Sequence, residues 1–337
     1  MRKKPLAFVW LSCLLLVQAC ALQPIASGSD RSLGEPATAV AARVALGVDT
    51  APAPMPSALR GLVGDDRMPD FLLLGEVHDH PLHHRLRLDW LTSLSASQPV
   101  AIVMEQFDQE RQADLDAARE RGDSARNLAG AAGFRFNGWD WTFYEPVVRL
   151  ALERGNLLFA ANLSVERARA IARGSATGEA ALADWSAADQ LAMEGEIDRG
   201  HCGMLPATAL GPMARAQLAR DATMATAMLR ARRESGLPVV LIAGNGHVRR
   251  DLGVPRHLLA QMPAARIISV GFLERGQTEP VGQADAGSPG AVIRYDLAVL
   301  TPAHQRPDPC EVFRQSYPRS KTSAGSIPNA KPGSASK

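Results

Sequence analysis

Apolar residues gather in short runs along this chain, and longer amphipathic or Ala-rich segments separate those runs. Five of the runs have the length of a β-strand and are almost continuously apolar: 71–74, 100–104, 157–161, 239–243 and 266–272. Continuous apolarity is typical of strands that are buried on both faces, as the strands of parallel sheets are. The pattern therefore predicts five buried strands at these positions, and 291–300 reads as a further, last strand.

The segments between these runs have helical patterns. Residues 81–94 place apolar side chains at intervals of four positions, which form one stripe of a helix: Leu82, Leu86, Trp90 and Leu94. Helices are also predicted over 108–121, 145–154 and 206–234, and glycines follow the last two, at positions where helices commonly end. Alternating strands and helices predict an α/β fold, with a mainly parallel sheet flanked by helices.

The N-terminus has the pattern of an export signal. Residues 1–19 begin with three basic residues, continue with a short apolar run and end in small residues, so they are predicted to be a signal peptide. The segment Val17–Cys20 resembles a bacterial lipobox, in which the cysteine becomes the lipidated first residue of the mature protein. An ordinary cleaved signal with an incidental cysteine is the alternative. Lipidation, for example by palmitate, would anchor Cys20 to a membrane. Lipoprotein sorting rules favour the outer membrane, because Ala21 is not an Asp.

Composition divides the rest of the chain. Residues 20–61 are rich in Ala, Pro, Ser and Gly, which predicts a lipidated tether and a weakly ordered lead-in. Residues 62–313 are predicted to form one α/β domain, in which the Ala-rich segment 164–206 is a helical cap insertion. Residues 314–337 are rich in Ser, Pro, Lys, Gly and Ala, and they are predicted to be a disordered tail.

The net charge of +2 hides an acidic body. Residues 20–313 carry 29 basic and 35 acidic side chains, because three of the 37 basic residues lie in 1–19 and five lie in 314–337. A body with a net charge of −6 lacks the basic footprint of a nucleic-acid-binding protein, so nucleic acid is not an expected partner. Any anionic ligand must therefore be bound by a few individual residues at its site and not by a broad basic surface.

Polar residues follow four of the predicted strands where each strand ends. They are Glu76 with His78, Glu105, Asn162 and His247. The carboxyl ends of parallel strands meet at one edge of the sheet, where such folds bind ligands, so we expect these side chains to form one polar site. A simpler interpretation is that the two glutamates cap neighbouring helices, since helix N-termini favour carboxylates.

These residues also carry a family resemblance. Gly75-Glu76-Val77-His78 and Gly244-Asn245-Gly246-His247 resemble the paired Gly-x-x-His motifs of the ChaN-like haem-binding lipoproteins, a family of the Tiki/TraB superfamily. Further matching segments are 103–107, 139–146, 161–162, 201–206, 216–217 and 220–221. The resemblance covers about residues 70–272. It implies a single α/β domain with helical additions, haem binding or iron uptake at the bacterial cell surface, and a haem-mediated homodimer.

Two groups of residues are candidate haem contacts. Tyr144 lies in an aromatic cluster with Trp141, and a phenolate suits ferric haem while aromatic rings line a porphyrin. The resemblance also favours a tyrosine ligand, although the same cluster is equally typical of a core. His201 and Met204 form the second group, with an exposed loop histidine as the alternative. Cys202 beside them either pairs with Cys310 or belongs to this site.

A metal-dependent hydrolase is the alternative function. Neutral histidines and carboxylates hold zinc or manganese, so Glu76, His78 and His247 are candidate ligands for a divalent metal in a peptidase or esterase. The wider superfamily includes enzymes, but the sequence lacks a Gly-x-Ser-x-Gly nucleophile motif. We therefore favour a haem-binding protein over an enzyme and assign no catalytic residue.

Overall fold

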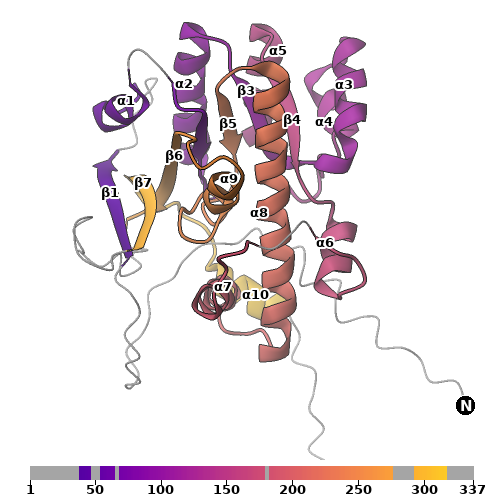
Figure 1. Ribbon diagram of the computed structural model, residues 1–337, viewed down its shortest axis with the longest axis vertical. Coiled ribbons are helices and arrows are strands. Elements are labelled where there is room, and N and C mark those ends of the chain that lie inside the picture. Colours follow the sequence, from indigo (N-terminus) through magenta and orange to yellow (C-terminus); the bar gives the residue numbers. More distant parts are fainter. Residues whose placement is uncertain (1–37, 47–53, 65–67, 179–181, 276–291, 317–337) are drawn as a thin grey trace, which may run out of the picture.

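A computed structural model describes residues 38–46, 54–64, 68–178, 182–275 and 292–316. Within these residues the strands form one seven-stranded sheet in the order β1-β7-β6-β2-β5-β3-β4, and every neighbouring pair is parallel (Figure 1). The predicted α/β class is confirmed. The strands β2, β5 and β3 at the centre of the sheet are not consecutive in the chain. After β2 the chain continues to β3 and β4 on one side of the sheet, and after β5 it continues to β6 and β7 on the other side. Ligand sites of open α/β folds form at such places.

The strands agree with the apolar runs. Their bounds are β1 Thr38–Ala45, β2 Phe71–Leu74, β3 Ala101–Asp108, β4 Leu157–Asn162, β5 Val239–Ile242, β6 Ile267–Glu274 and β7 Val292–Thr301. Strand β3 runs further than its apolar run, so Glu105 belongs to the strand and does not merely follow it.

The helices surround the sheet. Their bounds are α1 Ser57–Val63, α2 Pro81–Ser97, α3 Gln112–Glu120, α4 Ala125–Ala131, α5 Trp141–Arg154, α6 Val165–Ala172, α7 Ala187–Gly200, α8 Ala207–Ser235, α9 Val254–Gln261 and α10 Pro309–Ser316, with a 3₁₀ turn at Gln109–Arg111. Helices α5 and α8 end as predicted, because Gly155 and Gly236 adopt left-handed backbone conformations with φ of 67° and 68°.

The two faces of the sheet are covered by different helices (Figure 1). In β2, Leu72 and Leu74 face a core built with α1 to α5, whereas Phe71 and Leu73 face a core built with α8 and α9. All four side chains are buried, which explains why these strands are apolar at successive positions instead of at alternate ones.

The interpretation of 20–61 as a tether and lead-in needs correction. Residues 38–45 form the edge strand β1, which pairs with β7, and Leu59 of α1 is fully buried in the core. The sequence does not predict this strand, because half of its residues are alanine and its pairing partner lies more than 250 positions away. The predicted signal peptide and Cys20 lie outside the described residues, as does the predicted tail from residue 317 onward. Residues 314–316 belong to α10.

The predicted cap segment 164–206 contains helices α6 and α7. Met193 of α7 is buried against Ala214 of α8 and Leu252. A disulfide joins Cys202, just after α7, to Cys310 of α10, with a Cα–Cα distance of 5.6 Å. The disulfide alternative for Cys202 is therefore confirmed. Among the described helices, none combines the length and apolar composition that a membrane span requires.

Candidate functional site

Glu76 is the centre of a buried polar group at the carboxyl end of β2. It is 2% exposed, and its Oε1 accepts hydrogen bonds from the Tyr144 hydroxyl at 2.5 Å and from His78 Nδ1 at 2.8 Å. Its Oε2 forms an ion pair with Arg87. A buried carboxylate is costly unless it is paired and hydrogen-bonded, and this one meets both conditions.

Arg87 and His84 complete this group from helix α2. The Arg87 side chain has no exposed surface, and burial lowers its pKa to about 10, so it stays charged at neutral pH. Its Nη2 donates to His84 Nδ1 at 2.9 Å, and His84 Nε2 donates to the carbonyl oxygen of His78 at 2.8 Å. Burial lowers the pKa of His84 to about 4, which keeps this imidazole neutral.

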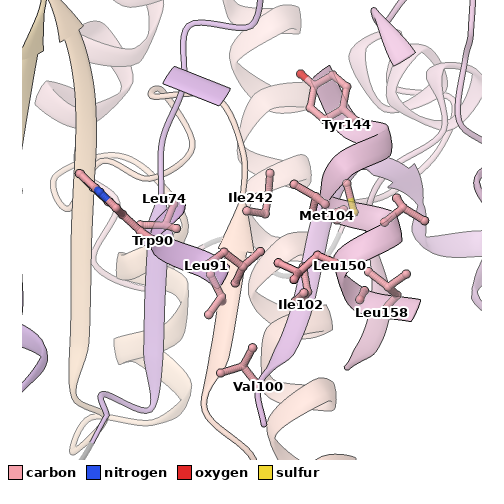
Figure 2. Close-up of a cluster of buried hydrophobic side chains, with 14 of the residues drawn as sticks. Leu74, Trp90, Leu91, Val100, Ile102, Met104, Tyr144, Leu150, Leu158 and Ile242 are labelled. Atoms are coloured by element: carbon pink, nitrogen blue, oxygen red, sulfur yellow. The ribbon is translucent and has the colours of Figure 1, made fainter. Parts of the chain in front are cut away.

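Tyr144 enters the site from the first turn of α5. Asp140 caps this helix by accepting a hydrogen bond from the Thr142 N–H at 3.0 Å. The Tyr144 side chain has no exposed surface, and burial raises its pKa well above the ordinary range. Trp139 and His84 lie edge-on to its ring, with centroids 5.6 and 5.1 Å away. Figure 2 shows Tyr144 at one end of the apolar cluster, opposite Val100.

His247 and Glu105 form a second charged group. His247 Nδ1 lies 2.6 Å from Asp221 Oδ1, and its Nε2 lies 3.4 Å from Glu105 Oε1. Burial disfavours charge on this imidazole, but the two carboxylates outweigh burial and raise the pKa of His247 to about 10. Burial also opposes charge on Glu105, yet attraction to His247 and a 2.7 Å hydrogen bond from the Gly244 N–H lower its pKa to about 2.

His78 lies where the two groups meet. A Cβ at Gly244 would stand 2.8 Å from the His78 ring, so the loop after β5 requires glycine here for the imidazole to fit. The edge of the same ring contacts Trp139, with centroids 4.9 Å apart. The His78 side chain is 12% exposed, and burial lowers its pKa, which favours the neutral ring at pH 7.

Four of the five residues predicted at the strand ends thus come together: Glu76, His78, Glu105 and His247. Asn162 has a different role, since its Oδ1 accepts hydrogen bonds from Arg220 at 2.6 Å and from the Leu163 N–H at 2.9 Å. In the described part of the chain, neither glutamate accepts a bond from a helix N-terminus, so the capping interpretation is not supported.

Sequence reasoning missed Arg87, and it noted Asp221 only as part of a matching segment, without a role in the site. Each has the same signal in the sequence, which is a charged residue within a helix segment that is otherwise mostly apolar. Arg87 adjoins the Leu86, Trp90 and Leu91 stripe of α2, and Asp221 lies among alanines and methionines that α8 buries. A buried charge of this kind needs a partner, and a search for such positions would have found both residues.

No hydrogen bond or ring contact in the described part of the chain joins the second predicted haem group, His201 and Met204, to Tyr144. His201 ends α7, is 5% exposed and is therefore not an exposed loop histidine; its Nδ1 donates to the Ile197 carbonyl oxygen at 2.7 Å. Its Nε2 has no hydrogen-bond partner among the described residues. Met204 is half-buried. Trp141 packs edge-on against Phe134. Trp141, from the first group, is connected to Tyr144 through Phe134, whose ring centroid lies 5.0 Å from that of Trp141 and 5.8 Å from that of Tyr144.

The metal alternative lacks a ligand set in the described part of the chain. No group of three or more His, Cys, Asp or Glu side chains there is arranged to hold a metal ion. Glu76 and His78 are hydrogen-bonded to each other, and His247 is engaged by Asp221 and Glu105. The divalent-metal interpretation of Glu76, His78 and His247 is therefore unsupported.

The fold and the site define an α/β protein with a buried polar cluster at the carboxyl edge of a parallel sheet. The chain belongs to the family described as haem-binding uptake, Tiki superfamily, ChaN, which matches residues 65–258. The family resemblance expected from the two Gly-x-x-His motifs is thereby confirmed. No curated protein matches the chain.

Among solved structures, the chain resembles ChaN of Campylobacter jejuni, whose structure is described as showing cofacial haem binding. The two are 22% identical with a TM-score of 0.55, over 64% of this chain and 84% of that one. An erythromycin esterase mutant, EreC, matches over 64% of this chain and 72% of that one, at 13% identity and a TM-score of 0.35. The type III effector HopBA1 matches over 70% and 88%, at 10% identity and a TM-score of 0.38. The first similarity supports the fold, and the other two are too low to support an argument.

Proposed function

We propose that this chain is a haem-binding lipoprotein of the bacterial cell envelope that takes part in haem or iron uptake, and that Tyr144 is its iron ligand. Membership in a haem-binding family supports the first part. The observation that carries the second part is that Tyr144 is the only tyrosine in the matched segment 65–258, and its hydroxyl is bonded to the buried Glu76.

The chemistry around Tyr144 fits this role. Bound haem would supply a ferric iron, which tyrosine oxygen holds in known haem proteins. To act as a ligand, the phenol must lose its proton, and Glu76 Oε1 at 2.5 Å is placed to accept it. Arg87 stays charged beside this pair, so the cluster keeps a positive charge next to the phenol oxygen after the proton has moved.

Access to Tyr144 is closed in this structure. The ring of His84 stacks on Phe143 with centroids 4.3 Å apart, and Trp139 covers another side of Tyr144. These side chains must move before an iron reaches the hydroxyl. We therefore expect haem to associate more slowly than by diffusion, as is usual when binding requires a conformational change. Stopped-flow mixing with hemin measures this rate.

His201, Trp141 and Met204 are proposed as secondary contacts. His201 offers a buried nitrogen without a hydrogen-bond partner in the described part of the chain, and it lies beside the ring of Phe313. The side chains of Trp141 and Met204 are half-buried, which leaves apolar surface for a porphyrin. Single alanine variants at the three positions, each titrated with hemin, rank their contributions.

The envelope location rests on Cys20. Metabolic labelling with palmitate should label the wild-type chain and leave Cys20→Ala unlabelled, and fractionation should place the labelled protein in the outer membrane. We also propose a homodimer in the haem-bound state. Size-exclusion chromatography with light scattering should show a doubled mass after hemin is added.

A hemin titration of the purified chain, with and without EDTA, tests the function. We expect a Soret shift that saturates at a defined ratio and is unchanged by the chelator. A titration without saturation would overturn the proposal.

A further inference from the structure

The surface between the start of α2 and the start of α5 is hollowed into an open groove of about 210 Å³. Its walls are mostly apolar and include Pro81, Leu88, Phe143 and Pro146. One cationic side chain, Arg85, also lines it.

The Arg85 guanidinium has no hydrogen-bond or ion-pair partner in the described part of the chain. Its Nε–H is buried without an acceptor, and no described carboxylate forms an ion pair with it. Arg87, two positions further on, is paired with Glu76. The half-buried guanidinium of Arg85 has donors available for an anion. A carboxylate ligand could pair with it through two parallel hydrogen bonds.

The groove adjoins the proposed iron site. His84 lines the groove, stacks on Phe143 at 4.3 Å between centroids, and stands edge-on to Tyr144 at 5.1 Å. His84 therefore both lines the groove and covers one side of the Tyr144 ring. A ligand held in the groove would lie against this cover.

We propose that this groove receives the carboxylate-bearing edge of haem, and that Arg85 pairs with a propionate. The inference rests on the proposed function. The volume is below the 300 Å³ or more of pockets that enclose a whole ligand, so it suits one edge of a porphyrin against apolar walls. The acidic body of the chain leaves attraction for a propionate to individual residues such as this arginine.

A larger groove on the other side of α5 is a weaker candidate for this role. It measures about 470 Å³ and contains Arg126 and Arg149 beside Trp141. However, Arg149 is already paired with Glu145 at 2.6 Å, and Arg126 lies over the Phe136 ring. Glu145 and Glu153 line the same groove and would repel a propionate.

The test compares two porphyrins and three variants of the full chain. Hemin and hemin dimethyl ester, in which the propionates carry no charge, are titrated into the wild type, Arg85→Gln and Arg85→Lys. Arg154→Gln is the matched control, since Arg154 is an exposed arginine at the far end of α5. Circular dichroism confirms that each variant is folded.

We expect Arg85→Gln to weaken hemin binding about tenfold, as loss of one charge-assisted hydrogen bond does, with an unchanged Soret maximum. Arg85→Lys should lose less, and Arg154→Gln should match the wild type. The dimethyl ester should bind the wild type and Arg85→Gln equally. Equal hemin affinity of wild type and Arg85→Gln overturns the inference while the proposed function stands. Failure of the wild type to bind hemin overturns both.

Discussion

The hydroxyl of Tyr144 donates a 2.5 Å hydrogen bond to Oε1 of Glu76, which precedes it by 68 positions in the chain. This bond connects the first turn of α5 to the end of β2, and it brings the only tyrosine of the family-matched segment into contact with the first Gly-x-x-His motif. A phenol, a carboxylate and the paired Arg87 guanidinium thereby share one buried cluster. Proton transfer within this cluster would prepare the phenol oxygen for a cation.

Removal of the Glu76 charge should destabilise the fold. Glu76→Gln leaves Arg87 buried without its ion-pair partner, which typically costs about 3–5 kcal/mol. Urea unfolding followed by circular dichroism measures the loss. The double variant Glu76→Gln with Arg87→Met should recover much of it, because no uncompensated charge remains. An unfolding midpoint of Glu76→Gln equal to that of the wild type would show that the ion pair does not stabilise the protein.

Acid should lower the folding stability of the protein through protonation of His84. Its pKa is about 4 in the folded state because burial disfavours the charged ring, against about 6.5 in an unfolded chain. The unfolded chain therefore binds more protons between these values, and stability decreases as pH falls from 6.5 toward 4, by at most about 3 kcal/mol. Unfolding free energies measured across this range for wild type and His84→Gln test this. The variant should show the shallower dependence, and identical slopes would rule out His84 as a source.

Gly244 and Gly246 provide a matched pair of substitutions in one loop. A Cβ at Gly244 would lie 2.8 Å from the His78 ring, whereas one at Gly246 meets nothing within 4 Å. Gly244→Ala should displace His78 and cost about 1–3 kcal/mol, as overpacking commonly does. Gly246→Ala should be nearly neutral. Thermal unfolding and the imidazole NMR resonances of His78 report both effects. If Gly244→Ala changes neither the unfolding temperature nor these resonances, the close packing of His78 against Gly244 is refuted.

Reduction of the Cys202–Cys310 disulfide should destabilise the protein. The bond closes a loop over a sequence separation of 108, for which the chain-entropy model predicts about 4–5 kcal/mol. Thermal unfolding with and without a reductant measures the difference. The Cys202→Ser/Cys310→Ser variant should unfold at the lower temperature in both conditions. If the reductant leaves the wild type unchanged although thiols are titrated, the bond adds no stability.

The sheet could be predicted from sequence where burial imposes a simple pattern. Strands β2 to β6 are buried on both faces, so continuous apolar runs predict them. Gly155 and Gly236 predict the ends of two helices. Strand β1 was missed because alanine has little strand preference, and only β7, far away in the chain, gives this segment a partner.

The polar cluster was predictable only in part. Glu76, His78, Glu105 and His247 follow apolar runs, and parallel topology brings strand ends together. Their pairing was not predictable, because Tyr144 and Arg87 reach Glu76 from helices whose rotation depends on the packing of whole apolar faces. Both Tyr144 and His201 are candidate ligands in the sequence, and the family resemblance favours the tyrosine. In the structure the Tyr144 hydroxyl is bonded to a carboxylate, whereas His201 Nδ1 donates to a backbone carbonyl oxygen.

The central claim is that Tyr144 holds the haem iron, and one comparison tests it most directly. Hemin is titrated into wild type, Tyr144→Phe and Tyr295→Phe. Tyr295 is the matched control because its hydroxyl is also buried, donates to the Asn245 carbonyl oxygen at 3.3 Å, and lies outside the family-matched segment. We predict that Tyr144→Phe alone changes the Soret maximum and weakens binding, while Tyr295→Phe behaves as the wild type. A Tyr144→Phe protein with the wild-type spectrum and affinity would contradict the claim.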